Sequence, residues 1–355
     1  MIFFERHRMN TLTNVAPLFV GALFLSVPMA AQAQNSSSKT ERGSIQEMVS
    51  SPEHKQRRAQ VAKFIAVAEN TRIFDLSVTW DENTPLLGAP NPTYSMVLDA
   101  THGTTRGTFG AGDRGDGGQL SLTTENQLWS GQHGAPTIDA LGHIARNGKL
   151  FGGVDAEAAT IDRRGIGRGP DGTGSELGID RFPADKLINR AVLLDVARFV
   201  QGDDSPLPPD FEITAEHLSQ TARAQNVEIE PGDTVLIRTG WGQHLVGNPE
   251  LYRGANSPGL GLDGAQYLID KKVFAAGNDT LTFEKRPPIT SEPRFQIFPV
   301  HMRLIADSGI YIIENYYLEE LSKAGAYEFL LATPPIKIRG GTGSALRSFA
   351  LVPGQ

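Results

Sequence analysis

The sequence predicts a single α/β domain with mixed β-sheets and flanking helices. Short apolar runs typical of buried strands alternate with amphipathic stretches typical of helices over much of the chain. No internal repeat and no clear linker interrupts this alternation after the N-terminal region. A chain of 355 residues, of which 39% are hydrophobic and 21% charged, can also bury a sizeable core.

The individual elements follow from these patterns in chain order. Apolar runs predict strands at residues 73–80, 191–197, 233–241, 273–279 and 310–315, with two more strands around a glycine-rich turn near the C-terminus. Apolar residues at helical spacing predict helices at residues 214–226, 261–273, 300–309 and 317–325. Thr214 is expected to cap the first of these helices, because its hydroxyl can accept a hydrogen bond from the opening turn.

The N-terminal region has the organisation of an export signal. Arg6 and Arg8 precede an apolar run at residues 15–27, and the small-x-small tripeptide that ends at Ala33 fits a cleavage site. We therefore expect cleavage after Ala33 and a periplasmic location. The alternatives are a membrane anchor, for which the run is short, and translation from Met9.

The expected domain boundaries follow from this signal. Residues 1–33 form the signal peptide, residues 34–71 a polar linker with an N-terminal helical segment, and residues 72–355 the folded domain. After cleavage no membrane association is expected.

Composition excludes several classes of function. The net charge is −7 and no dense run of lysine or arginine occurs, which argues against nucleic-acid binding. The chain has no cysteine, so disulfides and thiolate ligands are absent, and any metal must be held by histidine and carboxylate side chains. Because no G-x-S-x-G motif occurs either, serine and thiol hydrolase mechanisms find no support.

Two glycine-rich segments, residues 102–118 and 164–176, are expected to be mobile loops near a site. Neither has the strand–glycine loop–helix arrangement of a phosphate cradle. The sequence GTGS at residues 341–344 is expected in a turn that links strands rather than as a nucleophile.

The densest group of potential metal ligands lies in the segment SGQHGAPTIDALGHI. It contains His133, Asp139 and His143, a spacing that suits a loop entering a helix, with glycine and proline bending the backbone. His301 and Glu314 are the downstream candidates, since both fall in apolar segments where a charge is costly to bury without a partner. Each residue also has an ordinary structural explanation, such as a helix cap for Asp139 or a solvated strand end for Glu314.

This segment resembles the signature H-x-G-T-H-x-D-x-P-x-H of the metal-dependent cyclase superfamily, which includes bacterial kynurenine formamidases and isatin hydrolases. The corresponding residues here are HGAPTIDALGH, at 133–143. The blocks FDLSVTWDENTP, GDTVLIRTGW, AGNDTLTFE, HMRLIADSGIYIIENYYLEEL and IKIRGGTGSALRSFAL are similar to later family blocks and stand in the same order. The resemblance covers roughly residues 72–353 and implies the swivelling β/β/α-type cyclase fold.

The resemblance also implies roles for single residues. His133 matches a ligand of the first metal, and Asp139 matches a carboxylate that contacts both metals of two-metal members. His301 matches a ligand of the second metal, and Glu314 matches a carboxylate shared by both. His143 matches the catalytic proton donor and acceptor.

Thr137 departs from the family pattern at the position of a second histidine ligand. A threonine hydroxyl does not supply the affinity of imidazole for zinc or manganese, so the first metal position is weakened. The family's substrate-contacting tryptophan also falls at Leu86 or Leu87, which argues against kynurenine formamidase activity itself.

The resemblance implies a hydrolase that uses one or two divalent ions, zinc or manganese, to cleave a small amide, cyclic imide or lactone. The cation would activate water, and His143 would act as acid and base. The alternatives are a metal-poor relative that binds a small molecule without turning it over, and a dehydratase or cyclase that uses the same site. The expected partner is the small-molecule substrate, and the resemblance implies a homodimer or homotetramer.

Overall fold

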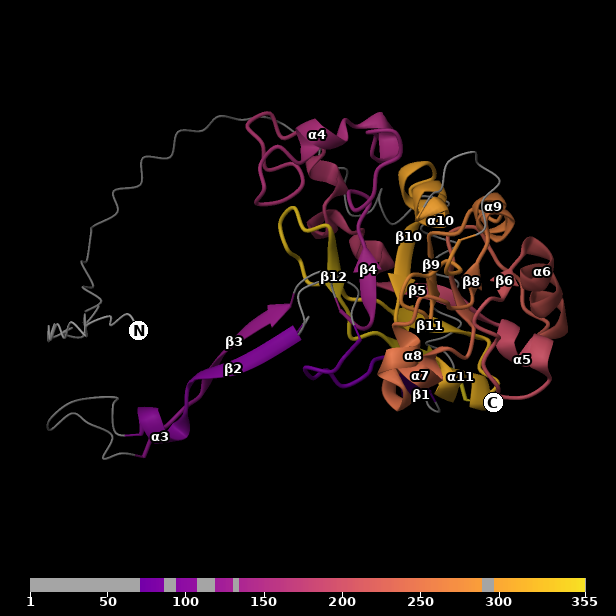
Figure 1. The fold of residues 1–355 in the computed structure, drawn as a ribbon, viewed down its shortest axis with the longest axis horizontal. Coiled ribbons are helices and arrows are strands. Elements are labelled where there is room, and N and C mark those ends of the chain that lie inside the picture. The colour runs from indigo at the N-terminus through magenta and orange to yellow at the C-terminus, as the bar shows by residue number, and fades with distance from the viewer. Residues whose placement is uncertain (1–70, 86–93, 107–118, 130–133, 289–296, 355) are drawn as a thin grey trace, which may run out of the picture. The chain divides into compact units, whose positions relative to one another are not determined.

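A nine-stranded mixed sheet forms the centre of the described part of the chain (Figure 1). The computed structural model describes residues 71–85, 94–106, 119–129, 134–288 and 297–354. The strands of the sheet, in spatial order, are β1 (Arg72–Asp75), β13 (Phe349–Val352), β11 (Glu328–Ala332), β5 (Ile188–Asp195), β7 (Thr234–Arg238), β9 (Ala275–Asn278), β10 (Tyr311–Glu314), β4 (Thr137–Asp139) and β12 (Gly343–Ala345). The single α/β domain with a mixed sheet and flanking helices is confirmed.

Four parallel strands, β5, β7, β9 and β10, form the middle of this sheet. Their register places Leu236 beside both Leu193 and Gly277. Both faces of these strands are buried, which explains why their sequences are continuous apolar runs rather than alternating ones. The strands on either side, β11 and β4, pair antiparallel with this centre and make the sheet mixed.

One face of the parallel strands is covered by helices. The covering elements are α5 (Val196–Gln201), α6 (Ala215–Ala224), α9 (Leu262–Asp270), α10 (Pro299–His301) and the π-helical η7 (Met302–Ala306). Their apolar side chains, among them Leu218, Leu268 and Leu304, pack in one cluster with Val192 and Ile312 of the sheet. This helix-covered face is the one on which the candidate site lies.

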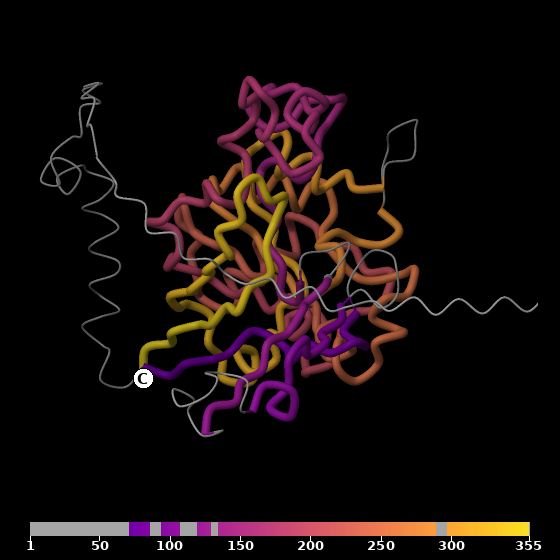
Figure 2. The backbone as a smooth tube through the Cα atoms, turned by 90° about the vertical axis from the view of Figure 1, so that its left-hand side faces the viewer, coloured from indigo at the N-terminus to yellow at the C-terminus, as the bar shows by residue number. Residues whose placement is uncertain are grey.

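Side chains on the other face of the parallel strands pack in a second cluster with α11 (Glu319–Lys323). This cluster extends over the antiparallel strands of the sheet. Phe329 of β11 and Ala350 of β13 share this second cluster with Leu193, Leu236 and Ile138. Figure 2 shows β1, in indigo, running beside the yellow C-terminal segment, with which it pairs antiparallel. Segments from both ends of the described chain therefore complete the same sheet.

The remaining strands and helices lie outside the nine-stranded sheet. Two additional pairs of strands are formed by β2 (Tyr94–Ala100) with β3 (Thr124–Trp129) and by β6 (Glu212–Ile213) with β8 (Gly259–Leu260). The other helices and single turns are α3 (His102–Thr105), η3 (Phe151–Gly153), α4 (Ala156–Ala159), η4 (Ser175–Leu177), η5 (Ile179–Arg181), η6 (Ala184–Lys186), α7 (Gly242–Gly247) and α8 (Pro249–Tyr252). Within the described ranges, no helix has the length and apolar character needed to cross a membrane.

Most of the expected elements after residue 180 are present, including the cap on α6, where the Thr214 hydroxyl accepts from the His217 backbone N–H. Several details were wrong, among them the turn expected at GTGS, of which Gly343 and Ser344 lie in strand β12 (Gly343–Ala345). The strand expected at residues 73–80 ends at Asp75, and the described C-terminal region contributes three strands, β11, β12 and β13, instead of two. The expected signal peptide at residues 1–33 lies outside the described residues, as do nearly all of the linker at 34–71 and most of the glycine-rich segment at 102–118.

Candidate metal centre

Asp139 is placed by the short strand β4. On β4, Ile138 packs in the second core cluster, so its neighbours Thr137 and Asp139 point to the opposite, helix-covered face. β4 pairs antiparallel with β10, and Glu314 at the end of β10 stands opposite Thr137. The prediction of a loop entering a helix is therefore wrong for this segment, because pairing with β10 and β12 extends it into a strand.

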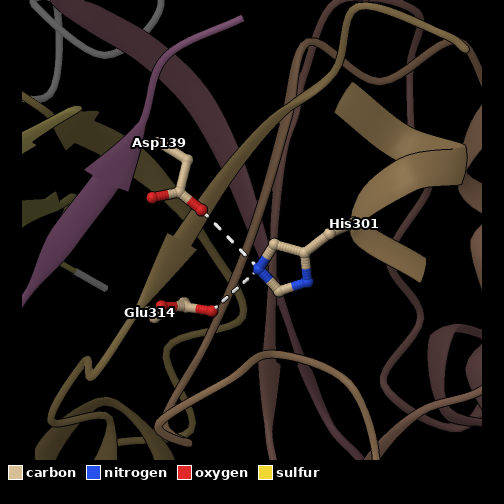
Figure 3. Close-up of side chains that lie close together, drawn as sticks. All are labelled: Asp139, His301 and Glu314. Atoms are coloured by element: carbon tan, nitrogen blue, oxygen red, sulfur yellow. Dashed lines mark hydrogen bonds and ion pairs between the residues drawn. The ribbon is translucent and has the colours of Figure 1, made fainter. Parts of the chain in front are cut away.

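His301 comes from the helix that covers this part of the sheet. Its Nε2 atom lies 3.1 Å from Oε1 of Glu314 and 3.6 Å from Oδ2 of Asp139 (Figure 3). One ligand atom from each of the three residues lies within 4.8 Å of the other two. All three residues are buried, at 2–4% exposure, so their charges are shielded from water. The structure thus brings together three of the five residues expected from the sequence.

The carboxylates of Glu284 and Glu314 determine the direction in which the pKa of His301 is shifted. Burial by itself would lower the pKa of His301, but hydrogen bonds and charges from Glu284 and Glu314 raise this pKa well above its ordinary value. The Nε2 side of the ring therefore favours a positive charge next to two carboxylates, either a proton or a cation.

Glu284 contacts the other side of the same ring. Its Oε1 atom lies 2.6 Å from Nδ1 of His301, and the carboxylate also accepts hydrogen bonds from the backbone N–H groups of Val300 and His301. The sequence analysis did not single out Glu284. The only signal was its place at the end of the block AGNDTLTFE, which the family resemblance included as a whole.

His143 lies beside Asp139 but outside the buried group. Its Nε2 atom is 3.9 Å from Oδ1 of Asp139, and its side chain is 36% exposed. An imidazole that is partly open to solvent and adjacent to a buried carboxylate is suited to exchange protons with a bound molecule.

Thr137 faces the same side of the sheet as Asp139, but its hydroxyl already has a partner. The Thr137 Oγ1 atom donates a hydrogen bond to the Ser344 backbone carbonyl at 3.4 Å, and the residue is fully buried. The position that carries a histidine ligand in the resembled signature is thus beside Glu314 yet supplies no imidazole. His133, the remaining expected ligand, lies outside the described residues.

The segment just after His133 is held by three hydrogen bonds to its carbonyl groups. Trp80 Nε1 donates to Ala135 at 2.6 Å, Asn315 Nδ2 to Gly134 at 3.3 Å, and the Leu346 backbone N–H to Pro136 at 3.0 Å. Gly134 has φ +154°, and a Cβ there would lie 2.5 Å from the Trp80 ring. The sequence analysis had not assigned Trp80 or Asn315 to the site, because neither is a ligand type.

The donor set fits a divalent cation. One imidazole and two carboxylates are ligands that zinc and manganese accept, and three protein ligands leave positions for water or substrate. Asp139, Glu314 and Glu284 form a concentration of buried carboxylates around one histidine, which a cation would neutralise. Within the described ranges, Asp139, His301 and Glu314 are the histidine and acidic side chains close enough together to hold a metal ion.

Comparison with known proteins identifies the family. The model of the family described as "Putative cyclase" matches residues 74–285, which is more than half of the chain and includes Asp139 and His143. The chain belongs to this cyclase family. The strand that carries Asp139 therefore lies within the segment that the family model matches.

Individual relatives agree with this assignment. Isatin hydrolase of Roseibium aggregatum is 30% identical over 178 residues, an alignment that covers 49% of this chain and 63% of that protein. A crystal structure of a novel cyclase superposes with a TM-score of 0.68 at 25% identity, covering 84% of this chain and 93% of the other. Isatin hydrolase A from Labrenzia aggregata shares the fold of the present chain, with a TM-score of 0.56 at 22% identity, covering 84% of this chain and 99% of the other.

Proposed function

We propose that this protein is a metal-dependent hydrolase that cleaves an amide, cyclic imide or lactone bond in a small molecule. The observation that carries the proposal is the convergence of Asp139, His301 and Glu314, three buried metal-ligand side chains from β4, α10 and β10. The identity with an isatin hydrolase, an enzyme named for a small cyclic substrate, supports the substrate class.

Asp139, His301 and Glu314 would hold the cation. When bound, a divalent ion supplies Lewis acidity to a substrate carbonyl and lowers the pKa of water toward about 7. His143, next to Asp139 and partly exposed, takes a proton from the attacking water and delivers it to the leaving nitrogen or oxygen. Asp139, 3.9 Å from the His143 ring, stabilises that ring while it carries the proton.

Zinc and manganese are the proposed metals, at one or two ions per chain. Zinc suits a site with one imidazole and two carboxylates, and manganese suits the oxygen-rich part of it. Thr137 favours the lower stoichiometry, because a hydroxyl at this position does not supply the affinity of imidazole for zinc or manganese.

The same observation at Thr137 supports a second candidate function, a relative that binds a small molecule without hydrolysing it. A cation held more weakly than in two-metal members would leave a pocket that binds the substrate class but turns it over slowly.

Export to the periplasm and assembly into a homodimer or homotetramer are further parts of the proposal, and they rest on the N-terminal sequence and on the family resemblance.

The decisive experiment is elemental analysis of purified protein that starts at Gln34, before and after incubation with excess zinc or manganese. We expect about one to two equivalents of metal in the wild type and a large loss in Asp139→Asn, which keeps the side-chain shape. Asp307→Asn is the control, because Asp307 is an exposed carboxylate that pairs with Arg146. This variant should retain the metal. Hydrolysis of isatin and of a panel of amides, imides and lactones is then measured. A wild type that takes up no metal would overturn the hydrolase proposal and leave small-molecule binding.

A further inference from the structure

Glu284 contacts His301 at two points and the preceding residue, Val300, at a third. Its Oε1 atom is 2.6 Å from the ring Nδ1 and 3.2 Å from the His301 backbone nitrogen, and its Oε2 atom is 3.0 Å from the Val300 backbone nitrogen. The two backbone groups lie in the first turn of the helix that begins at Pro299 and have no partner within that helix. One carboxylate therefore fixes both the start of the helix and the ring that the helix carries.

The main chain at Glu284 is itself held firmly. Phe283 has φ +55°, a left-handed conformation that is costly for a bulky residue, and its side chain is fully buried in the core. Its carbonyl accepts hydrogen bonds from Asn278 Nδ2 and the Leu260 backbone N–H. Gly259 packs so closely that a Cβ there would lie 2.3 Å from the Glu284 carbonyl carbon. The position of Glu284 is thus set by this loop and not by His301.

We propose that Glu284 is a positioning residue of the metal centre, which keeps the proton of His301 on Nδ1 and directs Nε2 toward Asp139 and Glu314. Both oxygens of Glu284 accept hydrogen bonds from backbone N–H groups, so the carboxylate serves as an acceptor here and the Nδ1 atom beside it donates. The Nε2 atom is then the one left to bind a cation, 3.1 Å from Glu314 and 3.6 Å from Asp139. A carboxylate behind a histidine ligand also raises the basicity of the ligand. This inference rests on the proposed metal-dependent function.

The test compares three variants by metal affinity, measured by calorimetry with zinc and manganese on metal-free protein. Glu284→Ala removes the acceptor for the ring, and Glu284→Gln keeps a neutral acceptor. Asp279→Ala is the matched control, because Asp279 is another buried carboxylate of the same loop that accepts backbone hydrogen bonds, from Thr239 and Gly242, without contacting His301. We expect Glu284→Ala to weaken metal binding about 10–100-fold, Glu284→Gln to be intermediate, and Asp279→Ala to stay within about threefold of wild type.

A second readout needs no metal. Nitrogen–proton correlation spectra of histidine-labelled, metal-free protein should show a slowly exchanging Nδ1 proton for one histidine, assigned by its loss in His301→Gln. That signal should disappear in Glu284→Ala and persist in Asp279→Ala. An unchanged signal in Glu284→Ala, or an equal loss of metal affinity in Glu284→Ala and Asp279→Ala, would overturn the inference. If the wild type binds no metal, the proposed function fails separately, and the spectra alone decide whether Glu284 holds the ring.

Discussion

Thr137 and Glu314 stand directly opposite each other on the antiparallel strands β4 and β10. Side chains at directly opposite positions share one face of a sheet, with Cβ atoms about 4.5–5.5 Å apart. The residue that departs from the metal-binding signature is therefore a neighbour of a proposed ligand, and its identity bears directly on how many cations the site holds.

Replacing Thr137 with histidine should add a ligand to the centre. We expect Thr137→His to raise the bound zinc or manganese, either in equivalents per chain or by about tenfold or more in affinity, because imidazole binds these ions where a hydroxyl does not. Elemental analysis and calorimetry measure this change. Thr137→Val is the control, since it removes only the hydrogen bond to Ser344 and should leave the metal content unchanged. Equal metal content in both variants would show that this position does not reach the cation.

His143 should affect turnover without affecting metal content. Replacement of a general acid–base group typically costs about 10²–10⁴-fold in rate, so we expect His143→Gln to lower kcat by that amount on any substrate the wild type hydrolyses. His102→Gln is the control, because His102 is an exposed histidine that contacts Ser121. If His143→Gln also lost the metal, His143 would be a ligand and not a proton carrier.

Arg238 should be critical for stability. It is fully buried and pairs with Asp195 at 2.8 Å and Glu319 at 2.7 Å. Arg238→Met leaves two buried carboxylates without this partner and should lower the free energy of unfolding by about 3–5 kcal/mol. Lys323→Met, which breaks an exposed pair with Glu320, should leave the free energy of unfolding nearly unchanged. Urea denaturation of both variants checks the difference, and similar losses would contradict it.

Alkaline pH should destabilise the protein in part through Tyr311. Burial raises the pKa of Tyr311 from 10.0 to about 12. Between these values the unfolded chain has released the phenolic proton while the folded chain retains it, so stability falls as the pH rises from about 10 to 12. Tyr311→Phe, which keeps the ring contacts with Phe182 and Phe274, should reduce the slope of unfolding free energy against pH in this window. An unchanged slope would show that Tyr311 does not contribute.

The parallel strands and their helices were predictable because each has a strong local pattern. The apolar run before Glu314 specified β10, and helical spacing around His301 specified the helix that carries it. Since both residues are ionisable groups inside apolar segments, they also stood out as candidates for the site, and Asp139 joined them through the motif.

The strands β4 and β12 were not predictable in the same way. Each has three residues and no apolar run, and each becomes a strand through pairing, β4 between β10 and β12. The contact between Glu284 and His301 could not be predicted from the sequence for a related reason. Its contact with His301 depends on the left-handed backbone at Phe283 and on the close approach of Gly259, neither of which has a local sequence signal.

The position of β4 has a consequence for the order of events during folding of the chain. β4 is held between β10, which carries Glu314, and β12, which comes from the last part of the chain. Asp139 therefore meets His301 and Glu314 only after β4, from the N-terminal half of the chain, has paired with β10, which is far away in sequence. During refolding, metal capture would then be a late event, because the ligands come together only when β4 pairs with β10.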